Sequence, residues 1–486
     1  MGTRKRGNVH MKLEHMANDL RQIHEASMQI LEKTGMKFHH PQIIELLHQK
    51  GVRVCGQTAY FTREQVLEWV GKAPAAFTLY ARNPNYDIVV GGDHVECCPG
   101  SGSPAVAASD GTKRPATLAD YINFLKLYQQ SDLYKVNGGF LVQPADMSMQ
   151  HCIAIMLYAT VLYSDKGIVT GTGTEEEVQA VMNMLQIVFG EAELAQRPRA
   201  ITIVNTNTPL QFDKKMLETM MVFIKYSQPV IIAACSMAGT TAPVTLAGTI
   251  ALTNAEVLAG IAVAQMLQAG TPVVYGSQTT TADMKTGSIA IGAPEGALCY
   301  EYAARLAKAY GLPCRGGGSL TDAKSLSVQA GYEAMLTYSA THRAHTNLIF
   351  QSAGIMDGYA AMSYEKFIVD LEIIGMVKRY LAGVAVNDNT LAVDVINEVG
   401  IAGQFLTAAH TLRHCRQEPF IPEISLRGTV TGHPADALLA KITARQNQLL
   451  AAYRKPELPR DVQRRLIEYL RGVGFATEYI EALQQM

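Results

Sequence analysis

The sequence predicts an α/β protein whose main part is a (β/α)₈ TIM barrel, with an N-terminal α+β extension and C-terminal helices. From about Thr117 onward, short apolar runs alternate with helical stretches, as in parallel strands joined by crossovers. The runs are rich in Val, Ile and Ala, which indicates burial on both faces. Seven or eight such units suit a closed barrel. An open doubly wound sheet is the alternative, but no Gly-x-Gly-x-x-Gly follows an early strand.

Residues 1–116 are expected to form the extension, packed on the barrel. Apolar residues at helical spacing, a proline in a first turn and glycines just past the ends favour three helices. Short β-like runs between Asn-Pro-Asn and Gly-Gly-Asp turns favour three strands. The helices are expected at Ala17–Gly35, Pro41–Lys50 and Arg63–Gly71, and the strands at Phe77–Ala81, Asp87–Val90 and Val95–Cys98.

Residues 117–417 are expected to form the catalytic barrel. Seven strands are predicted at Lys135–Val142, Gly167–Gly171, Ala200–Asn205, Pro229–Cys235, Thr271–Gly276, Leu312–Gly316 and Asn347–Gln351, and an eighth at Gln404–Ala408. Helices are predicted from Leu118 and at Asp213–Tyr226, Asn254–Gln268, Ala297–Tyr310 and Ser327–His342.

Residues 418–486 differ from the barrel segment in composition and pattern. Five prolines precede or separate two amphipathic stretches, near Ala435–Tyr453 and Arg460–Gly472. We expect a C-terminal helical cap that is used in subunit packing, and therefore a homo-oligomer.

The composition of the 486 residues excludes several classes of protein. Apolar residues make up 48% and charged residues 17%, which is typical of a large buried core. The net charge of -1 gives nucleic acid or an anionic membrane no electrostatic attraction. The eight cysteines form no Cys-x-x-Cys pair, which favours reduced thiols in the cytoplasm. No charge-free run of 18 apolar residues is present, and the basic start lacks the apolar stretch of a signal peptide.

In a barrel of this kind the site lies at the carboxyl ends of the strands, where this sequence is polar and rich in glycine. Arg315 ends an apolar strand beside three glycines and needs an anion, either a protein carboxylate or a substrate carboxylate. Asn205 and Gln351 also end strands and could hydrogen-bond a ligand or loop backbone. Three aromatic residues could wall a pocket that tolerates a quaternary ammonium, or could be core: Tyr275, Phe350 and Tyr359.

The sequence lacks the motifs of several other common enzyme classes. There is no His-Glu-x-x-His, no Gly-x-Ser-x-Gly and no Walker A loop. His410 and His414 could form a metal pair on one helix face, but no third ligand clusters with them, so no bound metal is expected. Asp322 and Lys324 are interpreted as a loop ion pair or helix cap.

Five motifs resemble the trimethylamine methyltransferase family, in order and over nearly the whole chain. They are Ile23–Gly35, Leu79–Pro84, Pro99–Pro104, Arg114–Tyr121 and Gly316–Lys324. The resemblance implies a (β/α)₈ barrel. The archaeal trimethylamine enzymes carry pyrrolysine, which this sequence lacks. The chain is therefore similar to the pyrrolysine-free branch, whose substrates are carboxylated quaternary amines such as glycine betaine, proline betaine, carnitine and γ-butyrobetaine.

The resemblance also implies roles for residues and partners. Arg315 matches the position thought to hold the substrate carboxylate, and Asn205 and Tyr359 fall at pocket positions. Gln351 stands where the glycine betaine enzyme has a histidine, which favours a differently shaped betaine. The methyl group would pass to the Co(I) of a corrinoid (cobalamin) carried by a partner protein, and a neutral tertiary amine would leave. No catalytic acid or base is needed, so the chain's task is positioning.

Two rival functions remain open from the sequence. A barrel lyase or aldolase acting on a small carboxylate would need a catalytic lysine or a metal cluster, for which Lys324 is the candidate. A non-catalytic family member would bind amines without consuming a methyl donor.

Overall fold

The computed structural model describes residues 16–147, 152–475 and 477–485. Its centre is a seven-stranded sheet in which all neighbouring strands are parallel, in the order β6-β18-β17-β14-β12-β10-β9. The strands are β6 (Glu96–Cys97), β9 (Ile168–Thr170), β10 (Ala200–Asn205), β12 (Val230–Ala234), β14 (Val273–Ser277), β17 (Cys314–Gly317) and β18 (Leu348–Phe350). Six of the predicted barrel strands, from β9 to β18, are thereby confirmed.

The other two predicted barrel strands differ from the structure. Residues 135–142 form no named strand; two isolated parallel bridges instead join Tyr134 to Cys97 and Val136 to Gly167, at the two edges of the sheet. The strand predicted at Gln404–Ala408 is wrong. That segment is coil and turn, with Phe405 and Leu406 exposed, because no sheet edge lies beside it to pair with its backbone. The edge of the seven-stranded sheet beside β18 is formed by β6, which belongs to the segment predicted to be the N-terminal extension.

Apolar side chains fill one face of the sheet. They include Ile201, Ile231, Val274 and Leu348, and they pack against the antiparallel hairpin of β4 (Ala76–Leu79) and β5 (Ile88–Gly91). Hydrogen bonds tie the region of this hairpin to residues just before two strands: the backbone N–H of Tyr80 donates to Pro198, before β10, and the side-chain amide of Asn347, before β18, donates to the carbonyl of Gly92. The hairpin therefore covers the amino ends of the strands and leaves the carboxyl ends for a site.

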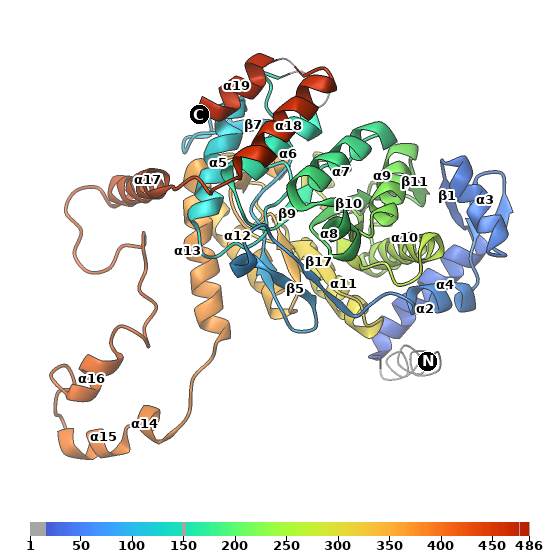
Figure 1. The fold of residues 1–486 in the computed structure, drawn as a ribbon. Helices are drawn as coiled ribbons and strands as arrows, with labels where there is room; N and C mark the ends of the chain where they lie inside the picture. The colour runs from blue at the N-terminus through green and yellow to red at the C-terminus, as the bar shows by residue number, and fades with distance from the viewer. Residues whose placement is uncertain (1–15, 148–151, 476, 486) are drawn as a thin grey trace.

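Helices cover the other face of the sheet, as predicted (Figure 1). They are α5 (Leu118–Gln130), α6 (Cys152–Tyr163), α7 (Glu175–Phe189), α9 (Lys214–Lys225), α10 (Leu246–Leu267), α11 (Pro294–Ala309), α12 (Val328–Arg343) and α13 (Tyr364–Leu381), with the short α8 (Glu191–Gln196) after α7. Among the described residues, α10 alone is long and apolar enough to cross a membrane. Because 83% of its most apolar window is buried inside the protein, it has the properties of a core helix.

The N-terminal helices pack on α10. The predicted helices are confirmed as α2 (Asn18–Lys33), α3 (Pro41–Gln49) and α4 (Arg63–Val70). Between them, β1 (Met36–Phe38), β2 (Arg53–Cys55) and β3 (Thr58–Tyr60) form a small sheet with β11 (Gln211–Phe212), which follows β10. This sheet anchors the extension to the loop after β10.

Two further small sheets are built from loops that follow the main strands. One contains β13 (Met237–Ala238), β15 (Thr280–Ala282) and β16 (Ile289–Ala290). The other contains β7 (Ala105–Ala107), β8 (Lys113–Pro115), β19 (Ile355–Met356) and β20 (Ala361–Met362). Both therefore lie beyond the carboxyl ends of the main strands.

Beyond α13 the chain leaves the body as a long projection and then returns (Figure 1). The projection carries three short helices, α14 (Asp388–Leu391), α15 (Val393–Val399) and α16 (Ala409–His414). The predicted C-terminal helices are confirmed as α17 (Pro434–Ala452), which packs on α13 and α5, and α18 (Arg460–Gly472), which packs on α7. A last helix, α19 (Thr477–Gln485), packs on α6.

Candidate functional site

Arg315, the second residue of β17, is a buried cation at the carboxyl end of the sheet. Its side chain is 4% exposed. Nη1 donates to the carbonyl oxygen of Ser277 at 3.2 Å, and Nη2 donates to Oε1 of Gln351 at 3.1 Å. The guanidinium carbon lies 4.9 Å from the centre of the Phe350 ring. These partners orient the guanidinium, but all of them are neutral.

The charge of Arg315 is not balanced by the protein that surrounds it. No carboxylate of the described residues forms an ion pair with Arg315, and its Nε has no hydrogen-bond partner. Burial lowers the pKa of Arg315, while nearby Tyr359 and Tyr300 act in the opposite direction. Because arginine stays protonated in proteins, this environment favours an anionic ligand.

A second polar group lies beside the arginine. Nε2 of Gln278 donates to the hydroxyl oxygen of Tyr300 at 2.9 Å and to that of Tyr359. Oε1 of Gln278 is buried without a hydrogen-bond partner. Tyr359 ends the 3₁₀ helix η2 (Asp357–Tyr359) with a φ of 74°, and burial raises the pKa of its hydroxyl. Burial thus keeps the hydroxyl of Tyr359 neutral, and Gln278 fixes its position near the cation.

Asn205 and Cys235 line the more open part of the site. Asn205 ends β10 on the face shared with Ile201 and Ile203, and its side chain is exposed. Cys235 follows β12 and is also solvent-accessible, yet burial raises the pKa of its thiol, with Arg315 acting in the opposite direction. Solvent therefore reaches this thiol although protein atoms surround most of it. Three strands separate Asn205 from Gln351 in the sheet order.

Tyr275 lies apart from this group. It is fully buried in the core between the sheet and the helices, where its hydroxyl donates to Oδ1 of Asn254 on α10 at 3.0 Å. Its ring stacks on that of Tyr310, with 6.5 Å between the centroids. The structure therefore brings together Arg315, Gln351, Phe350 and Tyr359, but not Tyr275.

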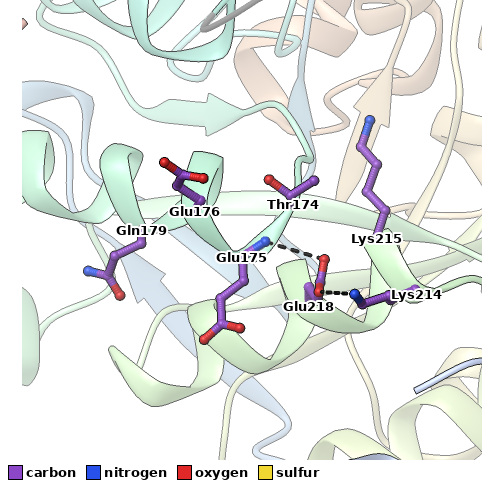
Figure 2. Close-up of a pocket in the computed structure, with 7 residues that line it drawn as sticks. All are labelled: Thr174, Glu175, Glu176, Gln179, Lys214, Lys215 and Glu218. Carbon is purple, nitrogen blue, oxygen red and sulfur yellow. Dashed lines mark hydrogen bonds and ion pairs between the residues drawn. The ribbon is translucent and has the colours of Figure 1, made fainter. Parts of the chain in front are cut away.

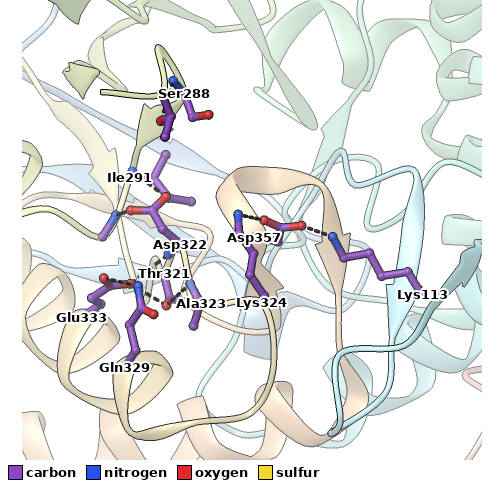
Figure 3. A network of polar contacts seen from close by, with 12 residues as sticks. Lys113, Ser288, Ile291, Thr321, Asp322, Ala323, Lys324, Gln329, Glu333 and Asp357 are labelled. Atoms are coloured by element: carbon purple, nitrogen blue, oxygen red, sulfur yellow. Dashed lines mark hydrogen bonds and ion pairs between the residues drawn. The ribbon is translucent and has the colours of Figure 1, made fainter. Parts of the chain in front are cut away.

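A polar network holds the loops beside the site (Figure 3). Asp322 accepts backbone hydrogens from Ile291 and Gly292 at 3.0 and 2.9 Å. Lys324 pairs with Asp357, the first residue of η2, and so does Lys113. Of the two interpretations of Asp322 and Lys324, an ion pair between them is therefore wrong, and neither residue caps a helix of the described chain. Asp322 caps loop backbone, whereas Lys324 helps to fix the loop that carries Tyr359.

A fully buried ion pair braces two more loops near the site. Lys366 and Asp370, one turn apart on α13, bond to each other with both side chains 0% exposed. Nζ of Lys366 also donates to the carbonyl of Ser319 at 3.2 Å, and Asp370 accepts from the backbone of Gly354 at 2.8 Å. Burial raises the pKa of Asp370 and lowers that of Lys366.

A separate cavity of about 660 Å³ lies between the first turns of α7 and α9 (Figure 2). Its walls are polar, and within them Glu218 accepts the backbone hydrogen of Glu175 at 3.3 Å and pairs with Lys214. None of its lining residues belongs to the Arg315 group, so we assign it no part in the candidate site.

The part of the chain that the structure describes contains no cluster of side chains suited to bind a metal ion. No group of three or more His, Cys, Asp or Glu side chains there could hold a metal ion. The rings of His410 and His414 lie 4.4 Å apart on α16. Their ring nitrogens contact Asn389, on α14.

Three residues of the site were missed in the sequence. Gln278 and Cys235 stand among polar residues at strand ends, so their position was the signal that could have found them. Tyr300 lies in the middle of α11, and no sequence pattern distinguishes it from a core tyrosine. Only the packing of α11 against β14 and β17 brings it to Gln278.

Comparison with known proteins gives a consistent result over almost the whole chain. Residues 5–472 match the profile of the family described as trimethylamine methyltransferase. The glycine betaine methyltransferase of Desulfitobacterium hafniense (strain Y51) is 39% identical over 460 residues, which cover 94% of this chain and 96% of that protein. The resemblance found in the sequence motifs is thereby confirmed.

Two further relatives cover most of the chain. A trimethylamine methyltransferase of Desulfitobacterium hafniense (strain DSM 10664 / DCB-2) is 32% identical, with 82% of this chain and 81% of that protein covered. The proline betaine:corrinoid methyltransferase of Eubacterium limosum is 27% identical, with 93% and 96% covered.

Proposed function

The chain belongs to the trimethylamine methyltransferase family, and on that basis we propose that it moves a methyl group from a carboxylated quaternary amine to the corrinoid of a partner protein. The substrate class is proline betaine, carnitine, γ-butyrobetaine or glycine betaine. The names of two relatives, a glycine betaine enzyme and a proline betaine:corrinoid enzyme, support both the donor and the acceptor.

The observation that carries the choice of a carboxylated donor is the uncompensated charge of Arg315. A buried arginine whose partners are a carbonyl, an amide and an aromatic ring retains a strong preference for an anion. Trimethylamine has no anionic group and would leave that preference unmet. A betaine carboxylate would satisfy it and bring the ammonium into the same pocket.

We assign the remaining pocket residues to positioning. Gln351 holds the guanidinium plane, and Phe350 and Tyr359 offer aromatic or neutral surface to the ammonium end. Asn205, exposed at the end of β10, can hydrogen-bond the substrate from the far side. Tyr275 is left out because it lies in the outer core.

This arrangement suits methyl transfer without a catalytic acid or base. The partner's corrinoid, when bound, supplies the nucleophilic metal centre that accepts the methyl group. The ammonium loses its charge as the methyl leaves, so a tight grip on the ammonium would stabilise the ground state. Arg315 binds the remote carboxylate instead, which orients one N-methyl without opposing that loss of charge. Solvent-accessible Asn205 and Cys235 leave the carboxyl ends open to an approaching partner.

We also propose that the parallel sheet closes into a (β/α)₈ barrel. The bridges of Tyr134 to Cys97 and of Val136 to Gly167 join residues 134–136 to both edges of the sheet and support closure. This segment would then take the place of the eighth strand. The proposed division is an extension at residues 1–116, a catalytic barrel at 117–417 and a helical cap at 418–486, with β6 of the extension contributing to the sheet. The eight free cysteines support a cytoplasmic location.

The test is an assay of the purified chain with Co(I) cobalamin, offered each of the four betaines, trimethylamine and choline in turn. We expect the visible spectrum to report methylation with at least one carboxylated donor and not with choline, a quaternary amine without a carboxylate. Arg315→Ala should abolish that activity, while the surface control Arg464→Ala should retain it. Methylation by choline or trimethylamine, independent of Arg315, would overturn the carboxylate assignment.

The two rival functions predict different results in the same assay. A non-catalytic amine-binding protein would show binding of a betaine by calorimetry but no methylation of cobalamin. A lyase or aldolase would depend on a lysine nucleophile, and Lys324 is exposed and paired with Asp357. This ion pair disfavours Lys324 as a nucleophile, so Lys324→Ala is expected to retain methyl transfer, weakened only as far as the loop of Tyr359 loosens, whereas removal of a catalytic lysine would abolish the reaction.

A further inference from the structure

The segment between α13 and the C-terminal helices is an arm that makes no buried contact with its own body. We define the arm as residues 383–417. No residue in it is buried, and Figure 1 shows it projecting away from the sheet and its helices. Its helices α14, α15 and α16 have 4, 7 and 6 residues, lengths that are not stable alone in water, where roughly 12–15 residues are needed. The arm therefore needs a surface to hold its structure.

The arm carries the side chains that such a surface would bury. Nine large apolar residues are exposed on it: Val384, Val386, Leu391, Val393, Ile396, Ile401, Phe405, Leu406 and Leu412. Hydrogen bonds between Asn389 and the two histidines of α16 tie α14 to α16, so these residues are presented as one unit. Exposed apolar sets of this size mark interaction sites.

Apolar side chains are also exposed along α12 and α13, which pack side by side. Three residues spaced four apart on α12 are exposed, Val328, Tyr332 and Leu336, with Val328 84% exposed. Met376 and Tyr380 are exposed on α13, and Tyr380 is 79% exposed. We call these five residues, with Arg343 and Lys378 beside them, the α12–α13 face.

The charges of the two surfaces are complementary. The part of the arm that holds α14 and α15 contains three carboxylates, Asp388, Asp394 and Glu398, and no lysine or arginine; the two arginines of the arm, Arg413 and Arg416, lie at its far end. On the α12–α13 face, Arg343 and Lys378 are exposed and form no ion pair within the described chain. Opposite charges at the rim of an apolar contact favour a specific partner and its orientation.

We infer that the arm of one copy covers the α12–α13 face of a second copy, and reciprocally, in a two-fold dimer. A chain that carries both an apolar projection and a matching apolar face is self-complementary, which is the requirement for such a dimer. Each copy would contribute nine exposed apolar residues from its arm and the seven residues of its α12–α13 face, which approaches the roughly 20–30 residues a side that stable complexes use. This inference does not depend on the proposed reaction.

A second copy fits the arm better than the corrinoid protein does. The arm joins the carboxyl end of α13, and a barrel-type helix runs antiparallel to its strands. The root of the arm therefore lies with the amino ends of the strands, where the β4–β5 hairpin covers the sheet. The site that a corrinoid must reach lies at the opposite, carboxyl ends.

Sedimentation velocity of the full chain tests the dimer. We expect wild type to be dimeric at micromolar concentration, and Ile401→Asp/Leu406→Asp to raise the dissociation constant at least 100-fold. Because neither side chain is buried in its own copy, the body of the monomeric variant should stay folded, and circular dichroism should lose no more helix signal than the three short arm helices contribute.

Charge reversal tests the face and the pairing. Arg343→Glu/Lys378→Glu should also give monomer, and adding Asp394→Lys/Glu398→Lys should restore the dimer. Lys33→Glu, an exposed charge on α2, is the control and should remain dimeric. A monomeric wild type, or a dimer that survives the arm substitutions, would overturn the inference. So would arm variants that stay dimeric but lose methyl transfer to the corrinoid protein, since the arm would then be the docking site for that partner.

Discussion

Nη2 of Arg315 donates a hydrogen bond of 3.1 Å to Oε1 of Gln351, and this amide is the only side-chain hydrogen-bond acceptor that the guanidinium has within the described residues. Nε2 of Gln351 in turn donates to Oγ of Ser101 at 3.3 Å, which fixes which end of the amide faces the arginine. A neutral acceptor orients Arg315 and leaves its charge available. The pair therefore accounts for both the geometry and the electrostatics of a carboxylate site.

Gln351→Glu tests whether that free charge binds the substrate. The new carboxylate would pair with Arg315 and compete with the substrate, so we expect KM for the carboxylated donor to rise about 30-fold or more, from roughly 2 kcal/mol of lost charge-assisted binding. Steady-state kinetics with the active betaine measures this. Gln351→Met removes the hydrogen bond without adding charge and should raise KM less. Equal effects of the two variants would argue against an electrostatic role.

Gln351→His tests substrate choice. The resemblance places a histidine at this position in glycine betaine enzymes, so the substitution should shift the ratio of kcat/KM values toward glycine betaine by about tenfold, a difference of roughly 1.4 kcal/mol. Competition between glycine betaine and the preferred donor in one reaction gives the ratio directly. An unchanged ratio would show that Gln351 does not select the substrate.

Gly317→Ala tests the close packing beneath the site. A Cβ there would lie 2.8 Å from Nε2 of Gln278, 2.8 Å from Cζ of Tyr300 and 2.6 Å from Cδ1 of Leu320. We expect a loss of stability of about 1–3 kcal/mol and a rise in KM, because Gln278 must move and releases Tyr359. Gly331→Ala on α12 is the control: nothing lies within 4 Å of its added Cβ, and it should be neutral or stabilising.

His24 should make the fold sensitive to acid. Its side chain is 3% exposed, Nδ1 contacts the hydroxyl of Tyr310 at 2.9 Å, and burial lowers its pKa from 6.5 to about 4. A depressed folded pKa contributes stability that is full above pH 6.5 and is lost as pH falls toward 4. From pH 7 to pH 5 the loss is about 2 kcal/mol.

Urea unfolding at both pH values, in wild type and His24→Gln, measures this contribution. Part of the acid sensitivity remains in the variant, since burial also lowers the pKa of His342 to about 4. The difference between the two proteins isolates His24. If both lose the same stability between pH 7 and pH 5, His24 is protonated without penalty and the assignment is wrong.

The buried pair Lys366–Asp370 should be costly to break on one side only. Lys366→Met leaves Asp370 buried without its cation and frees the carbonyl of Ser319, so we expect a loss of about 3–5 kcal/mol in the free energy of unfolding. The double variant Lys366→Met/Asp370→Leu removes both charges and should recover most of that loss. Thermal denaturation of the three proteins measures the series, and additive losses would contradict coupling of the pair.

Much of the fold was predictable because local patterns reflect burial. The strands from β9 to β18 are apolar runs bounded by turn residues, and the helices between them have amphipathic or apolar spacing; α7 and α9 also have side-chain N-caps. The prediction of a strand at Gln404–Ala408 was wrong because the local pattern there does not reflect burial. An apolar pair in a polar context resembles a strand, but these residues lie in the arm, where no strand is available for pairing.

Residue type and spacing along the chain were enough to predict the α/β class, six strands of the sheet, and the presence of Arg315 and Gln351 at strand ends. Which side chains meet depends on the tertiary structure. It placed Tyr275 in the outer core, brought Tyr300 and Gln278 to Tyr359, left Arg315 without a carboxylate, and put β6 at the edge of the sheet. Contacts between residues far apart in the chain depend on how helices pack on the sheet, and this packing is a property of the whole fold.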